Sequence, residues 1–173
     1  TALQKTFGHA RVTPLAAWGF VDLHDVYQPT EENTRLRGLN IARQSDRSVV
    51  INALHIFEVD GLDQEQLEAA IAKGARETEH VLAFLRSSFP GFENAEIASM
   101  PTELYVRETR HILAEYQLPI TDVWENRDHW DQIALGSYPV DVQASSINDL
   151  GFIISDPKQY AIPFRSLVPL EID

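Results

Sequence analysis

Hydrophobic and polar residues alternate along the first third of the chain in a pattern typical of β-strands. Short β-branched or aromatic stretches at residues 11–14 and 17–23 are bounded by proline, glycine and histidine. Residues 36–42 alternate apolar and polar with period two, and residues 49–57 form a second apolar run after the polar segment 45–48. Two such runs around a short polar turn predict a β-hairpin.

A different period follows the hairpin and predicts one long amphipathic helix, from about residue 64 to residue 88. Asp63 is the expected N-cap, with Gln66 completing a capping box, and Pro90 and Gly91 end the helix. Glycine inside a helix costs about 1 kcal/mol relative to alanine, so we expect Gly74 to lie against a neighbouring element. Apolar or small residues recur at alternating spacings of four and three, as one stripe: Leu67, Ile71, Gly74, Thr78, Val81 and Leu85.

The second half of the chain returns to strand-like patterns, interrupted by a short helix expected at about residues 121–131. Residues 95–99 and 103–116 are rich in β-branched and aromatic residues, and a last strand is expected at residues 160–169. Between them, a strand pair or a bulged strand is expected around Gly136. Strands outnumber helices and most connections are short, so the predicted fold class is α+β with a largely antiparallel or mixed β-sheet.

The amino-acid composition and net charge limit the classes of protein to which the chain can belong. The chain has 173 residues, 44% of them hydrophobic, which suits a single domain spanning residues 1–173. Acidic residues outnumber basic ones by 26 to 14, and the net charge of −12 argues against a nucleic-acid partner. No apolar run approaches the roughly 20 residues that span a bilayer. The chain holds no cysteine, which excludes disulfides and thiolate chemistry and is compatible with the cytoplasm, where we expect the protein.

A charged stretch at residues 107–111 is the first candidate for binding or catalysis. Arg107 and Arg110 carry guanidinium groups, which bind carboxylates or phosphates through two parallel hydrogen bonds. His111 follows directly. The same charges are also typical of an exposed strand whose side chains pair across a sheet.

Two further segments hold a tyrosine and an arginine at constrained positions. Tyr138 lies between Gly136 and Pro139, so a defined turn can present its phenol as a proton donor, although spacing alone favours a half-buried tyrosine at a bulge. Arg165 lies in a segment bracketed by Pro163 and Pro169, which confine that segment to an edge or a crossover.

Familiar metal and nucleotide motifs are absent from the sequence. The six histidines are scattered, and no pair has the close helical spacing of zinc ligands. A Ser-His-Asp triad lacks a Gly-x-Ser-x-Gly elbow to support it. The sequence contains no Gly-x-Gly-x-x-Gly fingerprint and no phosphate-binding loop ending in Gly-Lys-Ser/Thr.

Taken in order, the three candidate segments resemble the FAD-dependent oxidoreductase family. Each motif is short, but their order and spacing agree with the family over about residues 36–169. The resemblance rests on residues 106–112, 133–141 and 160–169, with shorter matches at residues 38–41, 52–55, 59–63 and 85–93.

The resemblance implies FAD as the cofactor of the full-length protein. Rossmann-type flavoproteins bind the phosphates of FAD with a glycine-rich fingerprint on a strand–turn–helix, and this sequence has none. We therefore expect an excised substrate-binding (cap) domain of a longer flavoprotein, whose partner is the missing FAD-binding domain. The isolated chain is expected to bind FAD weakly or not at all.

In this architecture the cap domain is expected to cover the flavin ring and to line the pocket of a small-molecule substrate. An arginine would stabilise an anionic reduced flavin or orient a substrate carboxylate, and a tyrosine would donate or accept a proton. The alternative is a stand-alone, non-catalytic domain that binds a ligand or a protein. The resemblance assigns catalytic roles to Arg107, Arg110 and Tyr138, and positions facing the substrate or the flavin to His111, Asp141 and Arg165.

Overall fold

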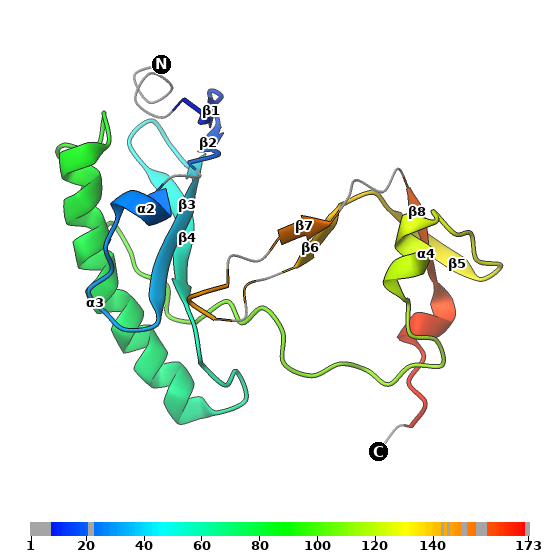
Figure 1. Ribbon diagram of the computed structural model, residues 1–173. Coiled ribbons are helices and arrows are strands. Elements are labelled where there is room, and N and C mark those ends of the chain that lie inside the picture. Colours follow the sequence, from blue (N-terminus) through cyan, green and yellow to red (C-terminus); the bar gives the residue numbers. More distant parts are fainter. Residues whose placement is uncertain are drawn as a thin grey trace. The chain divides into compact units, whose positions relative to one another are not determined.

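The computed structural model describes residues 8–20, 23–142, 144, 146–149, 152–154 and 159–171. The chain divides into two compact units, unit 1 (Thr1–Arg107) and unit 2 (Glu108–Asp173). Helices occur together with antiparallel sheets, which confirms the predicted α+β class (Figure 1). The single-domain organisation stays a prediction.

Unit 1 is built on an antiparallel sheet with the strand order β1-β2-β3-β4. The predicted hairpin is confirmed as β3 and β4, whose turn is closed by hydrogen bonds from Gln44 N and Ser45 N to Ser48 O. A bulge interrupts β3, and within it Gly38 has a φ of 55°, a left-handed conformation that glycine adopts without steric cost. The strands are β1 (Arg11–Val12), β2 (Ala16–Trp18), β3 (Thr34–Arg43) and β4 (Val49–Ile56).

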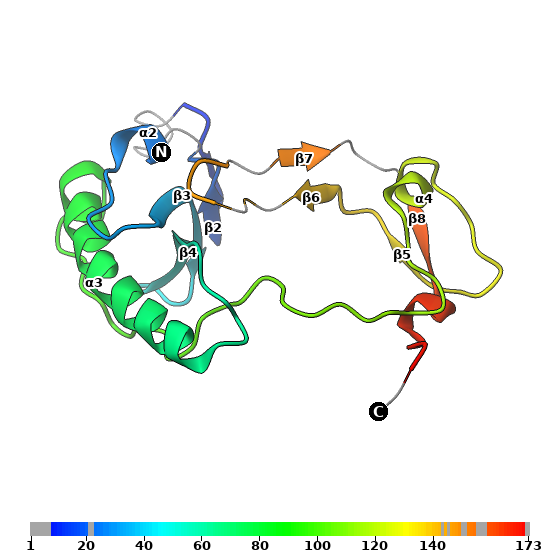
Figure 2. The ribbon, with the colours of Figure 1, turned by 60° about the horizontal axis from the view of Figure 1, so that its bottom comes forward.

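The long helix α3 (Gln64–Ser88) spans the predicted residues and lies along one face of this sheet (Figures 1 and 2). The carboxylate of Asp63 accepts hydrogen bonds from Glu65 N and Gln66 N, so the predicted N-cap is confirmed. A Cβ atom at Gly74 would lie 3.0 Å from Ile56 Cδ1. The helix therefore approaches β4 closely at Gly74, as expected from the energetic cost of a glycine within a helix.

An apolar core fills the space between α3 and the sheet. Phe20 and Phe89 are 2% and 1% exposed, and their ring centroids lie 5.3 Å apart. Phe89 also packs against Phe84 and Phe92, each at 6.2 Å between centroids. Complete burial of a side chain of this size stabilises a fold by about 1.5–3 kcal/mol. A short helix that was not predicted, α2 (Leu23–Val26), adds the buried side chain of Leu23.

One carboxylate is buried beside this core. Glu77 of α3 is 0% exposed and accepts hydrogen bonds from the Tyr27 hydroxyl, from Thr30 N at 3.0 Å and from Glu31 N at 2.9 Å. Burial alone would raise the pKa of this carboxyl, but the hydrogen bonds outweigh burial and hold the pKa below its usual value. Glu77 therefore ties residues 27–31 to the helix.

Unit 2 contains two small antiparallel sheets, a short helix and a 3-10 turn. The segment around Gly136 is neither a strand pair nor one bulged strand, because the strands before and after it pair with different partners. The predicted short helix is confirmed but ends at Trp124, and Asn126 follows with a φ of 52°. The elements are α4 (Ile120–Trp124), β5 (Gln132–Gly136) paired with β8 (Tyr160–Pro163), β6 (Val140–Val142) paired with β7 (Phe152–Ile154), and η1 (Phe164–Leu167).

The strands predicted at residues 95–99 and 103–116 are wrong. This described stretch contains no strand, and Ala114 alone forms a bridge, to Pro169. Within residues 103–116, charged side chains occupy alternate as well as neighbouring positions, so a strand there would have no continuous apolar face to bury. The last predicted strand also ends early, at Pro163, and continues as the 3-10 turn η1.

Candidate functional site

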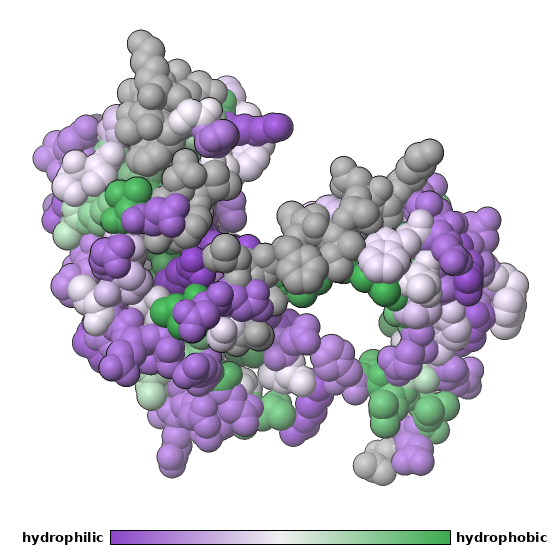
Figure 3. Space-filling model, viewed as in Figure 1, coloured by the Kyte–Doolittle hydropathy of each residue, from purple (hydrophilic) through white to green (hydrophobic). Residues whose placement is uncertain are grey.

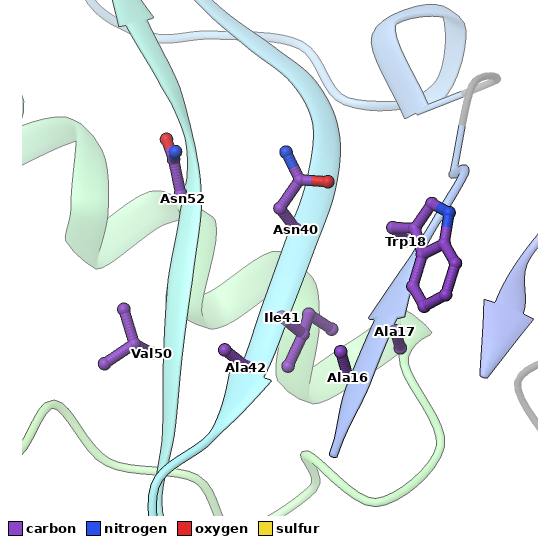
Figure 4. A pocket seen from close by; sticks show the side chains of 8 residues that line it. All are labelled: Ala16, Ala17, Trp18, Asn40, Ile41, Ala42, Val50 and Asn52. Atoms are coloured by element: carbon purple, nitrogen blue, oxygen red, sulfur yellow. The ribbon is translucent and has the colours of Figure 1, made fainter. Parts of the chain in front are cut away.

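The face of the β1–β4 sheet that points away from α3 is open and holds a hollow of about 280 Å³ (Figure 4). No charged side chain belongs to its lining. The hollow is lined by residues of β2, β3 and β4: Ala16, Ala17, Trp18, Asn40, Ile41, Ala42, Val50 and Asn52.

The strand register arranges this face, which we call the open face, in two rows. Asn40 and Asn52 are direct cross-strand partners, and Trp18 lies next to Asn40 on β2 (Figure 4). The second row consists of the paired residues Ala16, Ala42 and Val50. Arg11 of β1 pairs with Trp18 and extends the first row, which is therefore polar and aromatic with a cation at one end, whereas the other row presents only small apolar side chains.

A second cluster of functional groups lies in unit 2, around the buried carboxylate of Asp122. The Tyr116 hydroxyl donates a hydrogen bond to Asp122, which raises the pKa of Tyr116. Arg127 Nη1 lies 2.9 Å from Asp122 Oδ1, and His129 Nε2 lies 3.2 Å from Asp122 Oδ2. Both are ion-pair distances, but the groups are not aligned as hydrogen bonds. Asp122 thus holds three side chains of unit 2 together.

Arg165 joins this cluster from the beginning of η1. Its Nη1 donates to Asp131 Oδ1, its backbone N lies 3.0 Å from Asp131 Oδ2, and its Nη2 lies 3.2 Å from His129 Nδ1. The guanidinium carbon is 4.4 Å from the centroid of the Tyr116 ring, a cation–π arrangement. These contacts fix Arg165 in place and engage both terminal nitrogens of its guanidinium.

The catalytic candidates Arg107, Arg110 and Tyr138 are all exposed. The guanidinium of Arg107 lies 5.5 Å from the centroid of the Tyr105 ring. Neither Arg110 nor Tyr138 makes a hydrogen bond or an ion pair with another described residue. Both side chains are therefore available to a ligand.

The remaining candidates differ in how firmly they are held. His111 Nε2 lies 3.3 Å from Glu108 Oε1, with both side chains exposed. Asp141 is an exposed residue of β6, paired in register with Ile153. Arg165 is partly buried and is paired with Asp131. Within unit 2, the contacts of the described residues join none of the predicted residues to one another.

Sequence reasoning missed the residues that line the hollow and those that surround Asp122. The period-two pattern of residues 36–42 and 49–57 held a signal for the first group, because Asn40 and Asn52 occupy polar positions of two paired strands. Nothing in the sequence distinguishes Asp122 or His129 from exposed polar residues.

The described part of the chain shows neither a metal-binding cluster nor a membrane-spanning helix. No group of three or more His, Asp or Glu side chains there is arranged to hold a metal ion. Across the same residues, no helix is both long enough and apolar enough to cross a membrane.

A sheet with one face covered by a helix and, on the other, a hollow without charged residues in its described lining is an arrangement suited to binding a small molecule. The sequence matches the FAD dependent oxidoreductase family over residues 5–173, and the chain belongs to that family. The resemblance noted from the sequence is thereby confirmed. No curated protein and no solved structure matches the chain.

The described residues suit the ring of FAD better than its phosphates. A pyrophosphate binds at free backbone N–H groups of a helix N-terminus. At the N-terminus of α3, the carboxylate of Asp63 already accepts from Glu65 N and Gln66 N and would repel a phosphate. The described lining of the hollow, by contrast, is free of charged residues and presents Trp18 beside small apolar side chains, which suits a flat ring system. The described part of the chain thus forms no cradle for the phosphates.

Proposed function

We propose that this chain is the substrate-side part of an FAD-dependent oxidoreductase and acts together with a dinucleotide-binding domain. The open face lies over the flavin ring, and the hollow between Trp18 and Asn52 is one wall of the substrate pocket. The flavin supplies the redox chemistry, and this chain supplies binding, orientation and exclusion of water.

The observation that carries this proposal is the open face itself. Among the described residues of unit 1 no helix packs on this sheet face, which nevertheless presents an apolar row beside Trp18, which is 39% exposed. Apolar and aromatic surface of this kind stabilises a protein when a ring system covers it. Membership of a flavoprotein family supports the flavin as the group that lies nearby.

The exposed candidates have a second role in the proposal. Arg110 and Tyr138 are free of polar partners among the described residues, and we propose that they act as an anion-stabilising cation and as a proton donor. A catalytic role is likewise proposed for Arg107, a position facing the substrate or the flavin for His111, and the orientation of an arginine for Asp141. Arg165 is a positioning residue, because its guanidinium already contacts Asp131 and His129.

The test is a titration of the purified chain with two parts of the cofactor, followed by amide and indole NMR signals. Lumiflavin, the ring system without phosphates, is expected to shift the Trp18 indole signal and the side-chain amide signals of Asn40 and Asn52. ADP, the phosphate-bearing part, is expected to leave them unchanged. Trp130→Ala is the control, since Trp130 is 90% exposed and lies in unit 2. Lumiflavin that shifts no signal of the open face would overturn the proposal.

A further inference from the structure

The polar side chains that line the hollow of the open face indicate the class of substrate, because both are carboxamides. The two polar side chains of the hollow are Asn40 and Asn52. Neither carboxamide forms a hydrogen bond with another described residue, and both are exposed. Two neighbouring amide groups are therefore available to a ligand, each with an NH₂ donor and a carbonyl acceptor.

The chemistry of these amides favours a neutral ligand over an anion. A carboxylate or phosphate requires donors and positive charge, whereas each asparagine presents an acceptor oxygen beside its donors. No charged residue among those described lines the hollow itself, and Arg11, which pairs in register with Trp18, lies beyond the indole at the end of the asparagine row. A hydroxyl group, which both donates and accepts, matches a carboxamide in both respects.

The other groups of the hollow favour a ring. The indole of Trp18 lies at the end of the asparagine row, and Ala16, Ala42 and Val50 form the adjoining apolar row (Figure 4). An aromatic face beside small apolar side chains packs well against the C–H face of a saturated ring. The volume of about 280 Å³ lies just below the range of roughly 300–1,000 Å³ for ligand pockets, which suits no more than one such ring.

From these features we infer that the substrate is an uncharged ring bearing neighbouring hydroxyl groups, of the size of a monosaccharide. One C–H face of the ring packs on Trp18, and two hydroxyls bind the carboxamides of Asn40 and Asn52. This inference rests on the proposed function, in which the open face is the wall of the substrate pocket.

The test compares ligands of one shape and different charge on the complete chain. Methyl glucopyranoside is expected to shift the signals of Trp18, Asn40 and Asn52, and its charged counterpart glucuronate to bind more weakly. Trp18→Ala is expected to weaken glucopyranoside binding about tenfold, a loss typical of a lost aromatic contact. Asn52→Ala is expected to weaken it severalfold, while Trp130→Ala and Asn94→Ala, at exposed residues outside the hollow, leave it unchanged.

The outcomes separate this inference from the proposed function. Lumiflavin that shifts the open-face signals while glucopyranoside shifts none overturns the substrate inference and supports the flavin-facing role. Tighter binding of glucuronate, or wild-type binding by Trp18→Ala with unchanged α3 signals, also overturns the inference. Glucopyranoside binding without any response to lumiflavin supports the ligand class and overturns the flavin-facing role. Absence of both responses overturns the two together.

Discussion

Unit 1 buries large apolar side chains, with Phe20, Leu36, Leu39 and Phe89 at 1–2% exposed, whereas in unit 2 the charged residue Asp122 is buried to the same degree. Unit 1 also buries Glu77, but beside a continuous apolar core. In unit 2 the buried apolar residues among those described are smaller, namely Ala114, Val123, Ala161 and Pro163.

The difference shows that the two units are stabilised by different forces. Apolar burial is non-directional and tolerates changes of pH, whereas a network of charged groups depends on geometry and protonation. Unit 2 also leaves apolar side chains in solvent, with Leu113 at 75% and Leu170 at 64% exposed. Their backbones are joined by a hydrogen bond of 2.8 Å, and Figure 3 shows apolar side chains gathered near the C-terminal segment.

Removal of the central ring of unit 1 is expected to give the largest effect. Phe89→Ala creates a cavity among Phe20, Phe84 and Phe92, and should lower the free energy of unfolding by about 3–5 kcal/mol. Urea denaturation followed by circular dichroism measures the change. The matched variant Phe164→Ala, at a residue of unit 2 that is 56% exposed, should cost under about 0.5 kcal/mol. Equal costs for the two variants would contradict the assignment of the apolar core to unit 1.

Neutralising the buried carboxylate of unit 1 should have the next largest effect. Glu77→Gln turns an amide toward donors at Thr30 and Glu31, and should cost about 2–3 kcal/mol at neutral pH. Because the folded-state pKa of Glu77 lies below its ordinary value of 4.5, its contribution is complete above that pH and is lost as the pH falls through the folded value. The difference between wild type and Glu77→Gln should therefore shrink below pH 4.5. The exposed neighbour variant Glu79→Gln is the control, and a constant difference down to low pH would refute the assignment.

In unit 2, replacing the guanidinium of Arg165 by an amine should have a smaller and local effect on stability. Arg165→Lys keeps the positive charge but loses the paired contacts with Asp131 and His129 and the stacking on Tyr116, at a cost of about 1–2 kcal/mol. Hydrogen exchange at Tyr116 N, which bonds to Arg165 O at 3.3 Å, should become faster, while exchange in α3 stays unchanged. Faster exchange in both units would show that they do not respond separately.

The smallest expected change concerns the N-cap of α3. Asp63→Ala removes the acceptor for Glu65 N and Gln66 N and should cost about 1 kcal/mol. Asp63→Ser should restore most of this loss because serine is also a good N-cap. Thermal unfolding of the wild type and the two variants gives their order of stability. An Asp63→Ser variant no more stable than Asp63→Ala would argue against N-capping as the cause of the loss in stability.

The sequence predicts those parts of the fold whose stability is local. The helix at residues 64–88 and the hairpin at residues 36–57 have clear periods and short closing turns, and both are confirmed. The strand propensity of residues 103–116 led to a wrong prediction, because a strand also needs a partner with an apolar face. The burial of Glu77 depends on residues 27–31, about 50 positions away, and no local pattern reveals such a contact.

The candidate site is less predictable than the fold because it depends on register. Asn40 and Asn52 are ordinary polar residues until the bulge of β3 and the hairpin turn place them opposite each other. Trp18 joins them only because β2 pairs with β3 through Ala16 and Ala17. Motifs such as residues 107–111 indicate a family, but they do not reveal which side chains share a surface.

The covered face and the open face of the sheet also differ in how freely their residues can be substituted. Ala17 and Ile41 on one side are constrained by the core, whereas Asn40, Ala42, Val50 and Asn52 are exposed and contribute little to stability. Substitutions at these four positions can accumulate without threatening the fold. The same scaffold can therefore acquire new ligands through a handful of mutations, and a protein engineer who wishes to redirect this chain should begin there.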